Sequence, residues 1–454
     1  MPNQDAHRAG APATAAAPAI AASAASAATA AEVVRVVEAV WRIESARIIG
    51  ALARMLRDVG VAEELAQDAL VNALERWPEA GIPDKPAAWL MAVAKNRALD
   101  HLRHSKLQRA KEPALTWEIE TLLQDAAPDL DAALEDDIGD DLLRLIFIAC
   151  HPVLSTEARA ALTLRLLGGL TTDEIARAFF VSESTVAQRI VRAKRTLSEA
   201  RVPFEVPQAD QLVARLASVL QVIYLIYNEG YAASAGADWT RPKLCEEALR
   251  LGRILAELVP KEAEVHGLVA LMEIQSSRLR ARLGPGGEPV LLMDQDRTRW
   301  DQLLIRRGMA ALKRAEQIGS AYGPYALQAA IAACHARALT PEQTDWQRIA
   351  ALYDALAQLM PSPVVELNRA VVLSMAFGPE AGLELVDTLM GEASLRNYHL
   401  LPSVRGDLLS RLERKDEARV EFERAAALTN NLRERALLLA RARACMATGP
   451  GELC

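Results

Sequence analysis

A short stretch of the 454-residue chain carries polar and basic side chains with the spacing of one exposed helix face. Between Ser182 and Arg201 there are five basic and two acidic residues, a local charge of +3. Small polar side chains come first and cations follow, in the order Ser184, Thr185, Gln188, Arg189 and Arg192. Such polar groups can hydrogen-bond to base edges, while guanidinium groups bind phosphates. The stretch therefore predicts a surface that binds DNA.

Two short helices separated by a tight turn would position these side chains. Thr171 can cap the first helix, and Glu174 lies three residues later, the spacing of a capping box. Ser182 offers an N-cap for the second helix. Its buried stripe would be Val186, Ile190 and Ala193. Phe180 stands at the turn position where glycine is usual, so it either adopts φ > 0, at about 1–2 kcal/mol, or the turn is built differently. The pattern predicts a helix-turn-helix, and an ordinary helical hairpin with a basic, solvated face is the alternative.

Composition limits the other classes of function. The net charge of −7 means that any DNA contact must come from local patches or be assisted by a partner. The five cysteines are scattered without a CxxC motif, which argues against a zinc site or a disulfide framework and favours the cytoplasm. No apolar run approaches the roughly 20 residues of a membrane span. No nucleophile–base pair, phosphate-binding glycine loop or ligand cluster is evident, so we expect neither an enzyme nor a cofactor nor a metal.

A second helical block runs from Val33 to about Lys106. Its first amphipathic stripe would be Val40, Ile43, Ile48, Leu52 and Met55. The next helix, residues 62–77, exposes a polar face with Glu64, Gln67, Asp68 and Asn72, and for Gln67 and Asp68 we expect no packing contact. After a Pro- and Gly-rich loop, a further helix contains Asn96, Asp100 and Arg103. Between Asn96 and Lys111 there are five cations and one anion, a patch of +4.

These blocks, in this order, resemble bacterial RNA polymerase sigma factors of the sigma-70 family. The match is closest to the small extracytoplasmic-function (ECF) group, which keeps only regions two and four. The residues that carry the resemblance are Glu64, Leu65, Gln67 and Ala73; Trp89, Leu90, Ala94, Asn96, Ala98, Asp100, Leu102 and Arg103; and Thr185, Val186, Arg189, Arg192 and Ala193. Each block alone is weak evidence, but three in this order over about 170 residues are specific.

The resemblance implies a dissociable specificity subunit of core RNA polymerase. The face with Glu64, Gln67, Asp68 and Asn72 would bind the β′ clamp helices, although a merely solvated helix face is the alternative. The residues implied to read the −10 element are Asn96, Asp100 and Arg103. Those implied to read the −35 element are Ser184, Thr185, Gln188, Arg189 and Arg192, on a region four that would also bind the β flap.

Residues 112–141 contain eleven acidic residues and no Lys or Arg. By composition this is a solvated linker. The resemblance implies instead a polyanion that threads the RNA path of the polymerase.

Beyond Pro207 the chain continues for roughly 250 residues with a helical pattern. Gly406, Ala418, Phe422 and Ala425 match positions of a tetratricopeptide (TPR) repeat, and Tyr353 and Pro361 match an earlier one. Helix pairs are expected at 243–281, 345–377 and 397–428. The stretch 284–296 carries glycines and two aspartates; we interpret it as an excursion between helices rather than a metal loop.

The extension resembles a sigma subgroup in which it is thought to replace a separate anti-sigma factor, and the segment from Ile223 to Ser234 looks like that subgroup too. A concave solenoid surface suits a regulatory protein. The link 202–207 holds two prolines, so we expect the extension to be fixed against region four.

The sequence thus predicts an all-α chain of two small sigma domains followed by a TPR-like solenoid. The predicted parts are an Ala/Pro-rich disordered tail (1–31), region two (32–107), an acidic linker (108–140), region four (141–202) and the TPR-like domain (203–454). Two other functions remain: a stand-alone helix-turn-helix regulator with a TPR sensor, and a TPR scaffold. The sequence does not identify the promoter, the inducing signal or the regulatory partner, nor whether the extension activates or inhibits.

Overall fold

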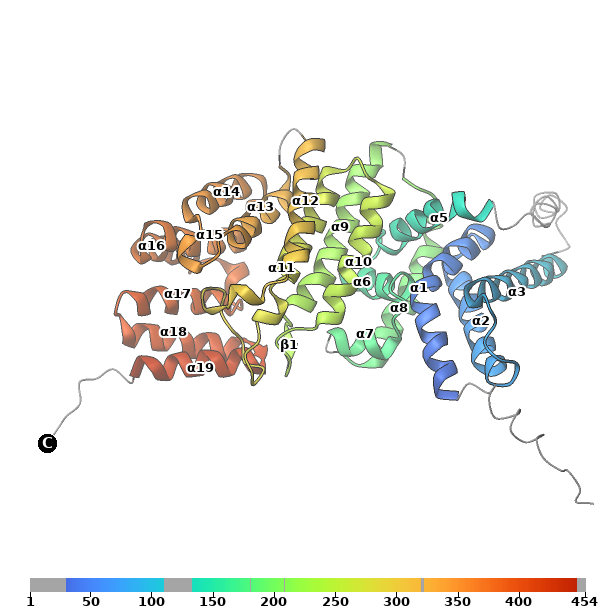
Figure 1. The fold of residues 1–454 in the computed structure, drawn as a ribbon, viewed down its shortest axis with the longest axis horizontal. Coiled ribbons are helices and arrows are strands. Elements are labelled where there is room, and N and C mark those ends of the chain that lie inside the picture. Colours follow the sequence, from blue (N-terminus) through green and yellow to red (C-terminus); the bar gives the residue numbers. More distant parts are fainter. Residues whose placement is uncertain (1–29, 110–132, 180, 208, 320–321, 447–454) are drawn as a thin grey trace, which may run out of the picture.

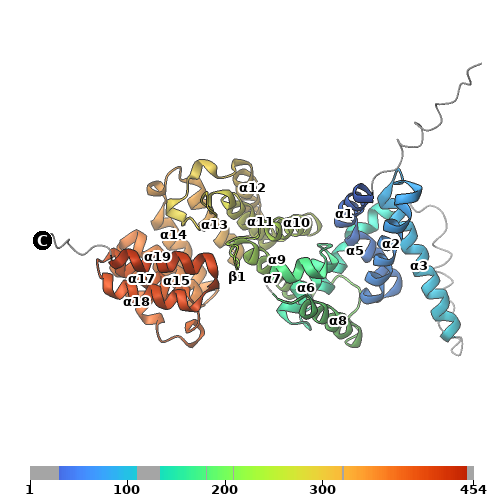
Figure 2. The same ribbon diagram turned by 90° about the horizontal axis from the view of Figure 1, so that it is seen from below.

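The computed structural model describes residues 30–109, 133–179, 181–207, 209–319 and 322–446. The regular secondary structure of this part of the chain is helical except for two 2-residue strands, so the predicted all-α class is confirmed. The predicted disordered tail, most of the acidic linker and Phe180 lie outside the described residues. Figures 1 and 2 show the helices following one another from α1–α3 at one end to α14–α19 at the other.

The N-terminal unit consists of α1 (Ala30–Leu56), α2 (Val59–Ala80) and α3 (Pro86–Arg109). Asp58 caps α2, because its carboxylate accepts hydrogen bonds from the amides of Gly60 and Val61 at 2.7 and 3.0 Å. Trp77 is buried and meets Trp89 edge to face, with ring centroids 5.4 Å apart. Ile43 was expected in the apolar stripe of α1, but its side chain is 66% exposed. The prediction for Ile43 was wrong because the buried face of α1 is the one that packs against α2, α3 and α5, and periodicity within α1 does not identify that face.

The central unit consists of α5 (Ala133–Ala149), α6 (Thr156–Leu166), α7 (Thr172–Phe179) and α8 (Glu183–Glu199). The predicted capping box is present: the amide of Thr171 donates to Glu174 at 2.9 Å, and the amide of Glu174 donates to the Thr171 hydroxyl at 3.2 Å. Ser182 caps α8 by accepting from the amide of Thr185 at 3.2 Å. The buried stripe of α8 is Val186, Ile190, Ala193 and Leu197. Local sequence signals therefore define both helices as predicted.

The extension runs from α9 to α19 as a succession of helices, each packed mainly on its neighbours in sequence. Its helices are α9 (Ala209–Tyr231), α10 (Pro242–Leu258), α11 (Ala263–Ser276), α12 (Gln302–Ile318), α13 (Pro324–Arg337), α14 (Trp346–Leu359), α15 (Pro363–Phe377), α16 (Pro379–Leu389), α17 (Leu400–Arg411), α18 (Lys415–Leu428) and α19 (Leu432–Met446). The expected helix pairs correspond to α10–α11, α14–α15 and α17–α18. In the last pair Ala418, Phe422 and Ala425 are buried.

The two ends of the extension meet. Strand β1 (Ala235–Gly236) pairs in parallel with β2 (Asn430–Asn431). The side-chain nitrogen Nδ2 of Asn431 also donates to the carbonyls of Ala233 and Asp238, at 3.0 and 2.8 Å. The last helices are thereby attached to the loop that follows α9.

A ladder of alternating aromatic rings and guanidinium groups fills the interior beside the loop between α11 and α12. Its order is Trp239, Arg282, Tyr231, Arg278, Trp300 and Arg297, with guanidinium-to-ring distances of 3.7 to 5.8 Å. Burial would raise the pKa of Tyr231, but Arg278 and Arg282 hold it below its ordinary value. Burial, with two of these arginines nearby, lowers the pKa of His335 to about 3. The ladder fixes the 278–300 loop, including the predicted excursion at 284–296.

Among the described residues no three His, Cys, Asp or Glu side chains could hold a metal ion.

By length and composition alone, one described helix could pass for a membrane span, over Gln211–Tyr231 of α9. Val213 of this span is exposed, but seven of its apolar side chains are buried inside the protein: Leu216, Val219, Leu220, Val222, Ile223, Ile226 and Tyr227. This is the pattern of a core helix.

Gly230, near the end of α9, lies where α10 packs closely. A Cβ there would be 2.7 Å from the Cys245 amide nitrogen and 2.8 Å from the Leu244 Cβ. We therefore expect Gly230→Ala to destabilise the protein by about 1–3 kcal/mol through overpacking, despite the better helix propensity of alanine. A methyl group at Gly391 would have no neighbour within 4 Å, so Gly391→Ala is the matched control. Thermal melting of both variants checks the prediction, and equal melting temperatures would contradict it.

Candidate nucleic-acid interface

Helix α8 presents a continuous exposed stripe along one face. Ser184, Gln188 and Arg192 are exposed on it, and Thr185 and Arg189 are half-buried beside it. The full stripe has the spacing i, i+3, i+4 over three turns: Ser184, Ala187, Gln188, Val191, Arg192 and Arg195. The structure thus brings the five predicted −35 residues together on one side of one helix.

Sequence reasoning missed three members of this stripe, Ala187, Val191 and Arg195. Val191 is 64% exposed, although an apolar residue in an amphipathic helix is usually assigned to the core. Val191 follows Gln188 by three residues and Ser184 by seven, and this helical spacing could have placed it on the same exposed face. Arg189 and Arg192 have no ion pair within the described residues, whereas Arg195 pairs with Glu199 at 2.6 Å.

The three predicted −10 residues lie along the exposed side of α3. Asn96, Asp100 and Arg103 are all exposed, and Arg103 pairs with Asp100 at 3.0 Å. A hollow of about 530 Å³ between α2 and α3 is lined by Leu65, Asn72, Arg76, Val93, Asn96, Arg97, Asp100 and His101. Two of the predicted −10 residues, Asn96 and Asp100, lie there beside Asn72, which is predicted to bind polymerase. Arg103 is not part of the lining. Lys106, Arg109 and Lys111 belong to the predicted cationic patch, but their side chains are not among those that the structure describes.

The predicted polymerase face of α2 is less free than expected. Glu64 is exposed, but Gln67, Asp68 and Asn72 are half-buried. Asp68 pairs with Arg97 of α3 at 2.8 Å, and the Gln67 amide donates to Glu63. The expectation that this face makes no packing contact was wrong, because α3 crosses one side of it and the central unit packs beside the other.

A buried carboxylate joins the N-terminal and central units. The side chain of Glu63 is only 5% exposed, and it forms ion pairs with Arg165 of α6, at 2.9 Å, and with Lys194 of α8. With the hydrogen bond from Gln67, the Glu63 cluster therefore links α2 directly to the helix that carries the DNA-facing stripe. Sequence reasoning missed this residue because Glu63 and Glu64 are adjacent acids on a polar helix, and only the tertiary structure distinguishes them.

Other contacts between these two units are also between side chains. Arg42 of α1 pairs with Glu174 of α7 at 2.6 Å, and Arg54 pairs with Asp141 of α5 at 3.2 Å. The buried apolar residues of the two units form one cluster. In the described arrangement the two units are therefore closed against each other.

The extension binds the central unit in a different way, through donors directed at main-chain carbonyls. Arg241 donates to the carbonyl of Ala178, at the end of α7, and its guanidinium is held by a nearly buried pair with Glu229. Arg250 donates to the carbonyl of Leu167 at 2.6 Å, and Ser218 donates to that of Cys150 at 2.7 Å. These contacts support the expectation that the extension is fixed against region four.

Comparison with known protein families gives three separate matches. The family described as "Sigma-70 region 2" matches residues 42–108, and "Sigma-70, region 4" matches residues 144–197. Residues 215–316 match a "Family of unknown function (DUF6596)". The first two families cover the second part of α1 with α2 and α3, and the end of α5 with α6–α8, including the predicted DNA-binding residues.

Related proteins cover different parts of the chain. An uncharacterized protein of Rhizobium meliloti (strain 1021) is 45% identical over 395 residues, which is 86% of this chain and 91% of that protein. "ECF RNA polymerase sigma factor SigK" of Mycobacterium ulcerans (strain Agy99) is 31% identical over 155 residues, 33% of this chain and 78% of SigK. "Probable ECF RNA polymerase sigma factor SigI" of Mycobacterium tuberculosis (strain ATCC 25618 / H37Rv) is 28% identical over 183 residues, 40% of this chain and 61% of SigI. No solved structure matches the chain.

Removal of the Glu63 charge provides a test of the contact between the two units. Glu63→Gln leaves Arg165 and Lys194 without their shared counter-charge, so we expect a loss of about 1–3 kcal/mol in the free energy of unfolding. Glu75→Gln, on an exposed position of the same helix, should stay within about 0.5 kcal/mol of the wild type. Chemical denaturation measures both variants. Equal stability would mean that the Glu63 cluster contributes nothing to closure.

Proposed function

The chain belongs to the extracytoplasmic-function sigma factors of the sigma-70 family, and on that premise we propose that α3 reads the −10 element and α8 the −35 element of its promoters. The N-terminal unit is then region two and the central unit region four. The observation that carries the proposal is the exposed face of α8, where polar side chains lie beside Arg189 and Arg192, two cations that form no ion pair among the described residues. A sigma factor acts in the cytoplasm with core RNA polymerase and promoter DNA, and it is not an enzyme.

The chemistry of the stripe suits a major groove. The amide of Gln188 can pair with the N6 and N7 edge of adenine, and the methyl groups of Val191 can contact the methyl group of thymine. Arg189 and Arg192 form no ion pair among the described residues and can bind phosphates on either side, although Arg189 also interacts electrostatically with Glu157, whose pKa it helps to lower. Ser184, at the N-terminal end of α8, is placed where recognition helices usually contact base edges.

Region two supplies the second set of contacts. Asn96 and Asp100, beside the hollow between α2 and α3, would contact the −10 strand, with Arg103 binding its backbone. Opening the duplex there costs a few kcal/mol, which a cationic groove can offset. The α2 face with Glu64, Gln67, Asp68 and Asn72 would bind the β′ clamp helices, while region four binds the β flap.

Promoter binding requires a more open arrangement than the one described. The −10 and −35 elements are about 25 base pairs apart, on the order of 85 Å at the rise of B-DNA. Helices α2 and α8 contact each other through Glu63 and Lys194, so the two reading surfaces cannot reach both elements at once. Regions two and four must therefore separate in the transcription complex, and the segment 110–132 connects them.

The extension would support region four and receive regulation. Its contacts with the carbonyls of Leu167 and Ala178 hold the C-terminal ends of α6 and of α7, the first helix of the helix-turn-helix. A regulatory protein bound to its helical array could act on region four through these contacts. A stand-alone helix-turn-helix regulator, the alternative, would have no use for the region-two helices.

Run-off transcription with purified core polymerase, on promoters selected by the holoenzyme, tests the function. Arg189→Ala should weaken −35 binding for all sequences alike and reduce the salt slope of log K by about one, because one phosphate contact is lost. Gln188→Ala should instead change the preference at one base pair. If Arg189→Ala leaves promoter binding unchanged, the assignment of α8 is wrong. Absence of any specific transcript would favour the stand-alone regulator.

The supporting role of the extension has its own test. Arg241→Met keeps the length of the side chain but removes the bond to the Ala178 carbonyl, so we expect weaker −35 binding although Arg241 is off the DNA-facing stripe. Arg306→Met, on an exposed position of α12, is the control. Gel-shift titration on −35 duplexes measures both variants. Wild-type affinity for Arg241→Met would show that the extension does not position the helix-turn-helix.

A further inference from the structure

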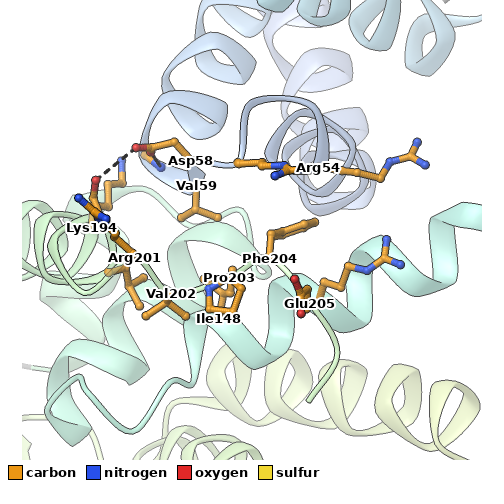
Figure 3. A pocket seen from close by; sticks show the side chains of 15 residues that line it. Arg54, Asp58, Val59, Ile148, Lys194, Arg201, Val202, Pro203, Phe204 and Glu205 are labelled. Atoms are coloured by element: carbon orange, nitrogen blue, oxygen red, sulfur yellow. Dashed lines mark hydrogen bonds between the residues drawn. The ribbon is translucent and has the colours of Figure 1, made fainter. Parts of the chain in front are cut away.

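A cavity of about 600 Å³ lies where region two meets region four. Figure 3 shows Arg54 of α1, with Asp58 and Val59 at the start of α2, on one side of it and Lys194 and Arg201 of region four on another. Its other walls come from α5 and from the segment 202–205 that leads to the extension. The volume is in the range that holds a small molecule.

The lining of the cavity carries more positive than negative charge. Its cations are Arg54, Arg57, Arg144, Lys194 and Arg201, and its acids are Asp58 and Glu205. Three cations already have partners, because Arg54 and Arg144 pair with Asp141 and Lys194 pairs with Glu63. Arg57 and Arg201 have no ion pair among the residues that the structure describes. One comes from region two and the other from region four, and both line the same cavity.

The backbone at these two arginines is held in an uncommon conformation. Arg57 has φ 54° and Arg201 has φ 47°, the left-handed region that costs a non-glycine residue about 1–2 kcal/mol. Each residue follows the end of a helix, α1 or α8, and each lines the cavity. The packing that maintains both turns also sets the positions of the two unpaired cations.

The rest of the lining is apolar. Val59, Ile148 and Leu197 are buried, and Val202 and Phe204 are half-buried beside them. An inorganic ion would leave this surface uncovered. A ligand with an anionic group and a flat apolar ring would use both kinds of wall.

We propose that this cavity binds an organic anion that carries an apolar ring, and that the bound anion stabilises the closed arrangement of regions two and four. The proposal rests on the proposed function, because closure has a consequence for transcription only in a sigma factor. Arg57 and Arg201 bind the anionic group from opposite units, and Phe204 and Val59 contact the ring. Since the cavity exists only while the two units are in contact, a ligand that binds it shifts the population toward the closed state.

Isothermal titration of the full-length protein with ATP, in magnesium-free buffer, tests the site. We expect saturable binding of ATP and no binding of adenosine, which has the ring but not the charge. Arg57→Gln and Arg201→Gln should each weaken ATP binding by about tenfold or more, the loss expected for one charge-assisted contact. Arg57→Lys should retain most of the affinity. Arg195→Gln removes a cation of α8 that does not line the cavity and should bind ATP as the wild type does.

The closure is tested by fluorescence energy transfer between labels on α3 and on α8. ATP should reduce the open fraction of the wild type and leave that of Arg57→Gln unchanged. Absence of ATP binding to the wild type, or equal weakening by Arg195→Gln, overturns the site. Binding without any change in the open fraction overturns the regulatory part. Neither measurement uses polymerase, so failure of the sigma assignment in run-off transcription would be a separate result.

Discussion

The buried carboxylate of Glu63 decides how regions two and four are arranged. A carboxylate that is 5% exposed is unfavourable unless cations surround it, and two of those cations, Arg165 and Lys194, are on α6 and α8 of the other unit. Region two therefore satisfies this group only while region four is close. The cavity beside Asp58 and the partial burial of Gln67 follow from the same closure. One charged residue thus couples the helix proposed to bind polymerase to the helix proposed to read DNA.

Region four is bound by its two neighbours through contacts of different chemistry. Region two approaches it with charged side chains, which water and salt can solvate when the units separate, and with apolar side chains of the shared buried cluster. The extension approaches it with donors for main-chain carbonyls, and separation would leave these carbonyls and the buried apolar side chains of α9 uncovered. Unpaired backbone groups are costly when no water can reach them. Separation of the extension from region four would therefore uncover main-chain carbonyls that separation of regions two and four does not, which favours the proposed opening between regions two and four.

Local features of the fold could be predicted from the sequence, whereas contacts between distant segments could not. The capping box at Thr171 and Glu174, the N-cap at Ser182 and the buried stripe of α8 depend on residues within a few positions of each other. Other features depend on segments that are 60 to more than 100 residues apart in the chain. They are the exposure of Ile43, the ion pairs of Glu63 and the hydrogen bond from Arg241 to the carbonyl of Ala178. The predicted DNA-binding residues of α8 share a face because helical periodicity places them there. Val191 was missed on that same face, because hydrophobicity alone does not say which apolar residues are covered.

The pairing of β1 with β2 changes what kind of array the extension is. In an open solenoid each repeat contacts only its neighbours, so the last repeat can unfold without effect on the first. Here Asn431 is bonded to Ala233, 198 residues earlier in the chain, and this closes the row of helices into a ring. Loss of α19 would release the loop after α9, which contains Arg241 and its contact with the helix-turn-helix. Ring closure places the start of the terminal helix beside the loop that follows the first one, so a disturbance at the C-terminal end has a short route to the promoter-reading helices.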